Sequence, residues 1–100
     1  MIRMMWLACR ASLGQFSDEF AVRGKDHQGN EFSLFTSRNF VRAEQEPRAD
    51  QDVPAWLKVA VLDRSGSLRL VQLPGQAFEY GSTITVGEDQ LEDSPSTQFA

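Results

Sequence analysis

The feature that most restricts the fold of this chain is a turn motif that occurs twice. Asp26–Gly29 (Asp-His-Gln-Gly) and Asp63–Gly66 (Asp-Arg-Ser-Gly) each separate two short segments rich in apolar residues. An aspartate at the first position accepts hydrogen bonds from nearby backbone N–H groups, and a glycine at the fourth adopts the left-handed conformation without a Cβ clash. Each motif therefore predicts a β-hairpin with a three-residue loop.

The first turn also predicts the register of the two strands that it joins. It places Lys25 opposite Glu31 and Val22 opposite Leu34. One face of this hairpin is then apolar, whereas the other face carries charged residues together with Phe35. A cross-strand ion pair between Lys25 and Glu31 is expected on the charged face.

In the second hairpin the same rule places Val59 opposite Val71 and Leu57 opposite Leu73. Apolar residues occupy both faces of this hairpin, which indicates a central position in the sheet or one face covered by the N-terminal strand. The two hairpins are either a duplication of one ancestral unit or two instances of a common turn. Both explanations stay open, because aspartate and glycine recur at turns for chemical reasons alone.

The flanking segments complete the expected fold. Trp6–Leu13 and Ser82–Val86 are predicted strands, and the second is rich in β-branched residues. Evenly spaced short strands favour an all-β fold over an α/β fold. We predict a five- or six-stranded antiparallel barrel of SH3-like or OB-like size, built from the two Asp-x-x-Gly hairpins. With 100 residues, 41% of them hydrophobic, the chain can form one such domain, which we place at residues 1–91.

One long connection interrupts this pattern, over residues 37–53. It is rich in charged residues and is expected to be a long loop or a short helix. Ser37 can cap one or two helical turns over 38–46, which Pro47 would end, so we expect at most one short helix there. The polar residues 92–100 are expected to form a flexible C-terminal tail.

The inventory of reactive residues argues against catalysis and metal binding. His27 is the only histidine and Cys9 the only cysteine, so neither a disulfide nor a zinc site of four nitrogen and sulfur ligands can form within one chain. We expect His27 to be exposed in the first turn and Cys9 to be a small buried strand residue. The acidic residues 88–93 lack the ligand spacing of an EF-hand loop, and no phosphate-binding glycine loop is present. We therefore expect no enzyme activity, no cofactor and no metal.

The N-terminal apolar stretch, Met4–Cys9, lies between Arg3 and Arg10. It is shorter than the hydrophobic region of a signal peptide and far shorter than a membrane span. We interpret it as part of the first strand and expect no membrane partner. A single thiol is compatible with a reducing compartment, so the prediction is a cytoplasmic protein.

The charge of the chain is negative but unevenly distributed. Ten Lys and Arg residues against fourteen Asp and Glu residues give a net charge of −4, which does not favour general affinity for nucleic acid or anionic membranes. Residues 1–48 nevertheless carry a net charge of +1, whereas residues 49–100 carry −5. Any anionic ligand is therefore expected on the N-terminal half.

Two functional hypotheses follow from these patterns. The favoured one is a protein-interaction or assembly module, including self-association as a homodimer, that uses exposed aromatic side chains around the 37–56 segment. Phe16, Phe40, Trp56 and Phe78 lie at predicted strand ends or in loops. Such side chains form interaction surfaces when they are exposed, or close the ends of a small barrel when they are buried.

The alternative hypothesis is a small barrel that binds single-stranded nucleic acid. Its cations would contact phosphates, while Phe35 would stack on bases. An ordinary surface of mixed charge is the competing explanation, since Glu31 falls in the same patch. Taken together, the two hypotheses give a candidate binding surface of Arg23, Lys25, Phe35, Arg38, Phe40, Arg42 and Trp56.

Overall fold

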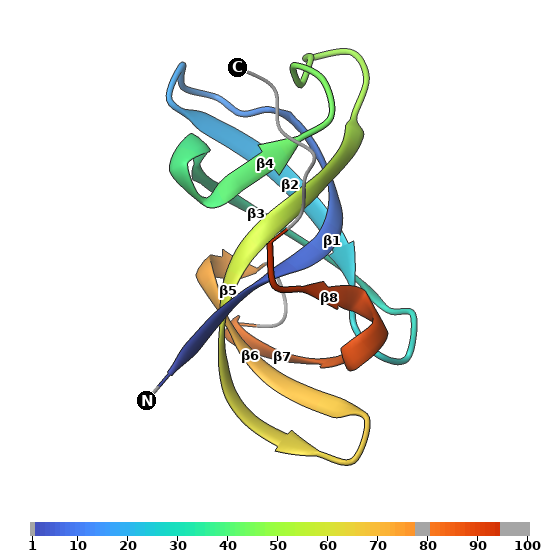
Figure 1. Ribbon diagram of the computed structural model, residues 1–100. Helices are drawn as coiled ribbons and strands as arrows, with labels where there is room; N and C mark the ends of the chain where they lie inside the picture. The colour runs from blue at the N-terminus through green and yellow to red at the C-terminus, as the bar shows by residue number, and fades with distance from the viewer. Residues whose placement is uncertain (1, 78–80, 95–100) are drawn as a thin grey trace.

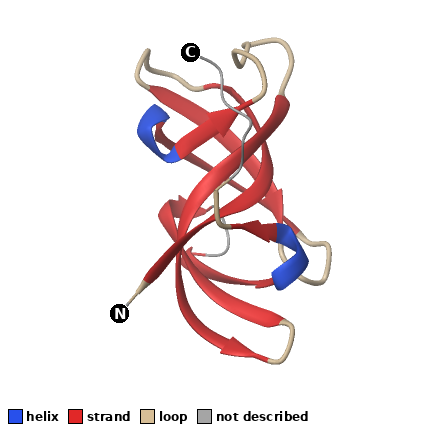
Figure 2. Cartoon of the chain, viewed as in Figure 1, coloured by secondary structure: helices blue, strands red, loops and turns tan. Residues whose placement is uncertain are grey.

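The computed structural model describes residues 2–77 and 81–94, and about two thirds of them lie in β-strands (Figures 1 and 2). The two longest strands, β1 (Arg3–Leu13) and β5 (Val53–Ser65), pair antiparallel from Arg3 opposite Val61 to Ala11 opposite Val53. Their inward residues, such as Leu7 and Leu57, are fully buried. This alternation of buried and exposed positions is the period-two pattern of a strand that covers a core.

The other strands extend this pair on both sides into an antiparallel sheet that curls into a half-barrel, in the order β3-β2-β1-β5-β6-β7. Short strands β4 and β8 pair with β5 and β1, and two 3-10 turns precede them. The remaining elements are β2 (Glu19–Lys25), β3 (Glu31–Ser37), η1 (Arg38–Phe40), β4 (Val41–Ala43), β6 (Leu68–Ala77), β7 (Gly81–Gly87), η2 (Glu88–Gln90) and β8 (Leu91–Glu92). The prediction of an all-β antiparallel barrel is confirmed at this level.

The curl brings β3 beside β6, and because the intervening pairs are all antiparallel, these two strands run in the same direction. A Cβ added to Gly75 on β6 would lie 3.1 Å from the backbone oxygen of Phe35 on β3. The turn between β2 and β3 also contacts β7, since His27 donates its backbone N–H to the Thr85 oxygen at 2.9 Å. His27 is exposed, as expected, but its turn holds the two sides of the half-barrel together.

The first hairpin pairs in the predicted register, with Lys25 opposite Glu31 and Val22 opposite Leu34. The Asp26 carboxylate accepts the backbone N–H groups of Gln28 and Asn30, both at 2.9 Å. The expected ion pair between Lys25 and Glu31 is not among the ion pairs of the described residues. The two residues face each other without that contact.

The second hairpin differs from the prediction. Val71 is opposite Val61 and not Val59, because β5 continues to Ser65 and turns through a two-residue loop, Gly66 and Ser67. Gly66 has φ +61°, the positive value that two-residue hairpin loops require at their first position. The pairing also shifts between Val61 and Asp63, where Leu62 forms a bulge. The prediction that both hairpins have a three-residue loop and the same register is therefore wrong for the second hairpin.

The 38–46 segment contains one turn of 3-10 helix and then a strand. Ser37 caps this turn as expected, since its hydroxyl accepts the Asn39 N–H at 3.3 Å. The chain leaves the helical conformation at Val41, which is buried and pairs with Leu57 as the first residue of β4. Burial of a β-branched residue in the sheet thus ends the helix earlier than Pro47 would.

Part of the segment expected to be a flexible tail is held by the sheet. Glu92 pairs with Trp6 in β8, and the side chain of Asp93 forms an ion pair with Arg3. The rest of that segment, residues 95–100, lies outside the described residues, as does Phe78.

Candidate functional site

Three cations and one aromatic ring share the outer face of β1, β2 and β3. Arg10 on β1 is directly opposite Arg23 on β2, and Lys25 follows two residues later on the same face. Phe35 on β3 is opposite Ala21 and therefore points to this side as well. We refer to Arg10, Arg23, Lys25 and Phe35 as the basic face. The side chains of Arg10 and Arg23 are 51% and 55% exposed, and Phe35 is 39% exposed.

A second aromatic side chain lies at one end of this face. Phe16 is in the loop that joins β1 to β2, and it is 68% exposed. This loop lies at the end of the hairpin that carries Phe35, whereas Lys25 lies toward the opposite end. The loop that carries Phe16 therefore lies at the same end of the basic face as Phe35, and the cations lie along the rest of the face.

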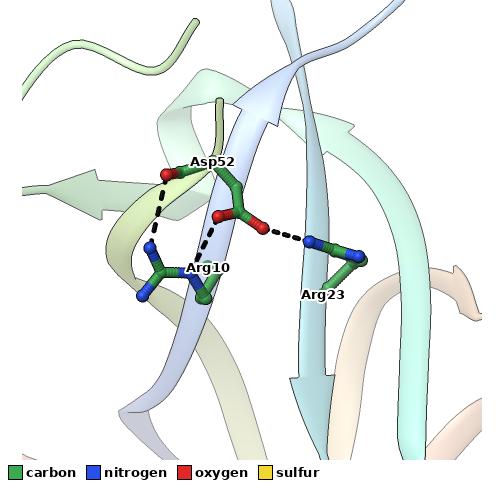
Figure 3. A network of polar contacts seen from close by, with 3 residues as sticks. All are labelled: Arg10, Arg23 and Asp52. Carbon is green, nitrogen blue, oxygen red and sulfur yellow. Dashed lines mark hydrogen bonds and ion pairs between the residues drawn. The ribbon is translucent and has the colours of Figure 1, made fainter. Parts of the chain in front are cut away.

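Arg10 and Arg23 converge on one carboxylate, that of Asp52, which directly precedes β5 (Figure 3). Arg10 donates Nε–H to Asp52 Oδ1 at 2.9 Å and Nη2–H to the Asp52 backbone oxygen at 3.3 Å, while Arg23 donates Nη2–H to Oδ2. The hydrogen bonds from Arg10 and then Arg23 lower the pKa of Asp52. In turn, the bond from Arg23 to Asp52 raises the pKa of Arg23. Asp52 is thus ionised and bound on both oxygens.

Next to this network the sheet opens into a hollow of about 270 Å³. It lies where β1 changes partners, because β1 pairs with β2 only from Arg10 onward and with β8 only at Trp6 and Leu7. Gln90 spans the opening, accepting the Gly87 N–H at 2.7 Å and donating to the Lys25 oxygen at 2.8 Å. The hollow is lined by Ala8, Cys9, Arg10, Arg23, Gly24, Lys25, Glu31 and Gln90.

The thiol of Cys9 borders this hollow but is suited to packing. Cys9 is partly buried and packs against the core, and burial raises the pKa of its thiol well above the ordinary range. Because the thiolate is the nucleophilic form, a raised pKa makes this cysteine unreactive near neutral pH. The chemistry of the hollow therefore comes from its charged side chains.

The structure brings together three of the seven residues predicted for a binding surface, Arg23, Lys25 and Phe35. The other four lie on different elements: Arg38 and Phe40 in η1, Arg42 on β4 and Trp56 on β5. Arg38 stacks over the ring of Phe20 at 4.7 Å, and Arg42 stacks over the ring of Trp6 at 4.3 Å. Trp56 is half-buried opposite Arg42, whereas Phe40 is exposed.

Sequence reasoning missed Arg10 and Asp52 as members of this site. Arg10 joins the face because β1 pairs with β2, and that pairing follows a loop with no turn motif like the one at Asp26. Asp52 is 29 residues from Arg23 and 42 from Arg10, so no local pattern connects it to either arginine. The available signal was the alternation in β1, which places Arg10 on the side opposite Leu7 and Ala11.

Within the described residues, no group of three or more His, Cys, Asp or Glu side chains is arranged to hold a metal ion. The part of the chain that the structure describes contains no helix long and apolar enough to cross a membrane. None of the family models, curated proteins or solved structures with which the chain was compared matches it.

Proposed function

We propose that this protein is a cytoplasmic, non-catalytic binding module that holds an extended single strand of nucleic acid across the basic face. The observation that carries the proposal is that Arg10, Arg23, Lys25 and Phe35 lie on one outer face. Proteins that bind single strands combine cations that contact the phosphates with aromatic rings that stack on bases. Both groups are present here within three neighbouring strands.

The net charge of −4 does not by itself decide this proposal, because a phosphate responds mainly to the charges near it. Glu88, Asp89, Glu92 and Asp93 lie in and after η2 and β8. Exposed charges separated by more than about 8–10 Å are largely screened at physiological salt, so local charge governs contact with a phosphate. On the basic face the three cations accompany three acids, Glu19, Glu31 and Asp52, and two of the cations bind Asp52.

The path of the chain supports the same proposal by analogy of fold. A β1-β2-β3 meander, with β5 beside β1 and β6 returning beside β3, is similar to the strand order of OB-fold barrels. In those barrels the face of the second and third strands and the adjoining loops bind oligonucleotides. The basic face and the loop that carries Phe16 occupy the corresponding places here. Because fold alone does not determine function, the proposal depends on the side chains.

The test is titration of a fluorescent oligothymidylate and an oligoriboadenylate at several salt concentrations. Replacing Arg23→Ala together with Lys25→Ala should weaken binding and reduce the slope of log K against log salt by about 0.7 for each phosphate that the variant no longer neutralises. The matched control is Arg3→Ala with Arg64→Ala, which removes two exposed cations far from the basic face. An equal loss of affinity in both double variants would show that only the overall charge matters, and would remove the basic face as the site.

A second candidate, self-association, is favoured by exposed apolar side chains near the start of β1. Met4 pairs with Ala60, and Arg3 pairs with Val61, so this end of β1 lies beside Leu62. On its other side, among the described strands, the pairing of β1 with β8 begins only at Trp6, which is opposite Glu92. We refer to the exposed residues Ile2, Met4, Leu62 and Leu70 as the apolar strip.

We propose a second copy of the chain as the occupant of this strip, added antiparallel along the Arg3–Met5 edge of β1. Open strand edges beside exposed apolar residues are the usual site of such pairing. Sedimentation over a hundred-fold range of concentration tests it, with Met4→Lys and Leu70→Lys expected to keep the protein monomeric. A wild-type protein that is monomeric over the whole range would contradict this candidate.

A further inference from the structure

The arrangement of Arg10 and Arg23 favours binding of an anion. The two arginines are directly opposite each other on neighbouring strands, where like charges destabilise a sheet. Both belong to regular strands, so their separation is determined by the pairing of β1 with β2. An anion that accepts hydrogen bonds from both guanidinium groups removes this repulsion, and Asp52 is that anion in the structure (Figure 3).

The anion itself comes from the connection between β4 and β5. Asp52 is the last residue before β5, and Val53 holds the backbone there by pairing with Ala11. The Asp52 side chain is only 19% exposed, although both of its partners are more than half exposed. Rotation of this one side chain would release both guanidinium groups from the carboxylate while the strands stay in place, and Arg10 would keep its hydrogen bond to the Asp52 backbone oxygen.

A carboxylate and a phosphodiester are equivalent partners for this pair. Each carries one negative charge and offers two oxygens to N–H donors, and arginine forms short, charge-assisted hydrogen bonds with both. The hollow beside the pair is lined by Arg10 and Arg23 but not by Asp52, which borders a second hollow together with Arg23 and Asp50. A phosphate in the first hollow therefore lies beside Arg10, Arg23 and Lys25, together with the acid Glu31, and does not have to pass Asp52.

We infer that Arg10 and Arg23 form a phosphate-binding fork that the chain occupies with its own Asp52, and that a phosphate group of the ligand displaces this carboxylate. The inference rests on the proposed function, because it identifies which side chains of the basic face hold the phosphate. When a phosphate replaces the Asp52 carboxylate, the charge bound by the two arginines stays the same, because each anion carries one negative charge. The internal carboxylate competes with the ligand, so affinity is lower than the same fork would give without it.

The experiment compares Asp52→Asn with Asp50→Asn. Both variants remove one negative charge from the same connection, but Asp50 is 74% exposed, and its ion pair is with Arg48, at 3.3 Å. Binding of oligothymidylate and of inorganic tripolyphosphate is measured by titration, and the arginine Nε–H signals are followed by NMR. Asp52→Asn should tighten binding of both probes about ten-fold, the effect of freeing one charge-assisted hydrogen bond. Asp50→Asn should change binding less than about two-fold, as for a screened surface charge.

Two results would overturn the fork. Equal increases in affinity in the two variants would mean that only net charge changed, and weaker binding by Asp52→Asn would mean that Asp52 holds the arginines in place for the ligand. Adding Arg10→Ala to Asp52→Asn should abolish the increase, and Asp52→Ser repeats the comparison with a smaller side chain. Thermal unfolding of each variant shows that it remains folded.

The two probes separate this inference from the proposed function. If tripolyphosphate binds with the expected difference but no oligonucleotide binds, the fork stands and the nucleic-acid proposal fails. If oligothymidylate binds equally to both variants, the proposed function stands and the fork fails. If neither probe binds any variant, both are overturned.

Discussion

The two hairpins of this protein begin from the same four-residue pattern and reach different structures. In β2–β3, Asp26 accepts two backbone N–H groups, and the turn also contacts β7 through His27. In β5–β6, the Asp63 carboxylate accepts the N–H of the next residue, Arg64, at 2.8 Å, and the strand continues to a later turn. The Asp-x-x-Gly pattern therefore gives the expected three-residue loop in β2–β3, where the turn also contacts β7, and not in β5–β6.

The outer faces of the two hairpins differ as much as their turns. The β2–β3 hairpin presents Arg23 and Lys25 with Phe35, whereas Leu62 and Leu70 are exposed on β5–β6. One hairpin thus exposes cations and an aromatic ring, and the other exposes aliphatic side chains. The difference between the two hairpins is tested by comparing a substitution in β2–β3 with a similar substitution in β5–β6.

The largest expected difference is between Phe32→Ala and Leu70→Ala. Phe32 is fully buried on β3, so its truncation should lower the free energy of unfolding by about 3–5 kcal/mol. Leu70 is partly exposed on β6, and its truncation should cost less than about 1 kcal/mol. Urea denaturation measures both. Similar losses of stability would mean that the β5–β6 hairpin contributes a core of its own.

Glycine substitutions should distinguish crowding from backbone strain. A Cβ at Gly24 would lie 2.7 Å from the ring of Phe32, so Gly24→Ala should cost about 1–3 kcal/mol of unfolding free energy. Gly66 has open space but φ +61°, so Gly66→Ala should cost about 1–2 kcal/mol through strain. In denaturation experiments, Phe32→Leu should recover part of the stability lost in Gly24→Ala and none of that lost in Gly66→Ala. If Phe32→Leu also restored the stability lost in Gly66→Ala, the cost at Gly66 would not come from backbone strain.

Removing the two turn aspartates should give unequal effects. Asp26→Ala deprives the N–H groups of Gln28 and Asn30 of their acceptor and should lower the melting temperature. Asp63→Ala should leave the melting temperature nearly unchanged, because the second loop, Gly66 and Ser67, does not depend on that carboxylate. Equal shifts in thermal unfolding would indicate that Asp63 supports the second turn after all.

The smallest effect concerns pH and belongs to the basic face. The pKa of Asp52 is lowered in the folded protein, so its stabilising contribution is complete above the pKa of the unfolded chain, near 3.9. That contribution is lost as the pH falls through the lower, folded value. Wild type should therefore be more stable than Asp52→Asn at neutral pH, and the difference measured by denaturation should disappear in acid. The control is Asp50→Asn, which removes a carboxylate that is 74% exposed from the same connection.

The sequence was informative where local chemistry decides the structure. The register of the first hairpin follows from Asp26 and Gly29, and the cap at Ser37 follows from its position before a charged segment. The same reasoning failed at β5–β6, because the bulge at Leu62 depends on how two strands twist around the core.

The candidate site was predicted only in part for a related reason. Arg23, Lys25 and Phe35 share a face because they belong to one hairpin, so alternation alone brings them together. Arg10 and Asp52 join them through β1 and β5, whose pairing connects residues about fifty positions apart. Pairings at such separations leave no periodic signal in the sequence.

The pairing of β1 with β8 has a consequence for how the chain is made. Trp6 and Leu7 receive their partners from Glu92 and Leu91, so the first strand stays incomplete along this edge until residue 92 has left the ribosome. Until then the apolar residues Met4–Cys9 have no β8 beside them. Newly synthesised chains with unpaired edges are prone to associate wrongly. Pairing along this edge of β1 therefore has to wait for β8, the last strand among the residues that the structure describes.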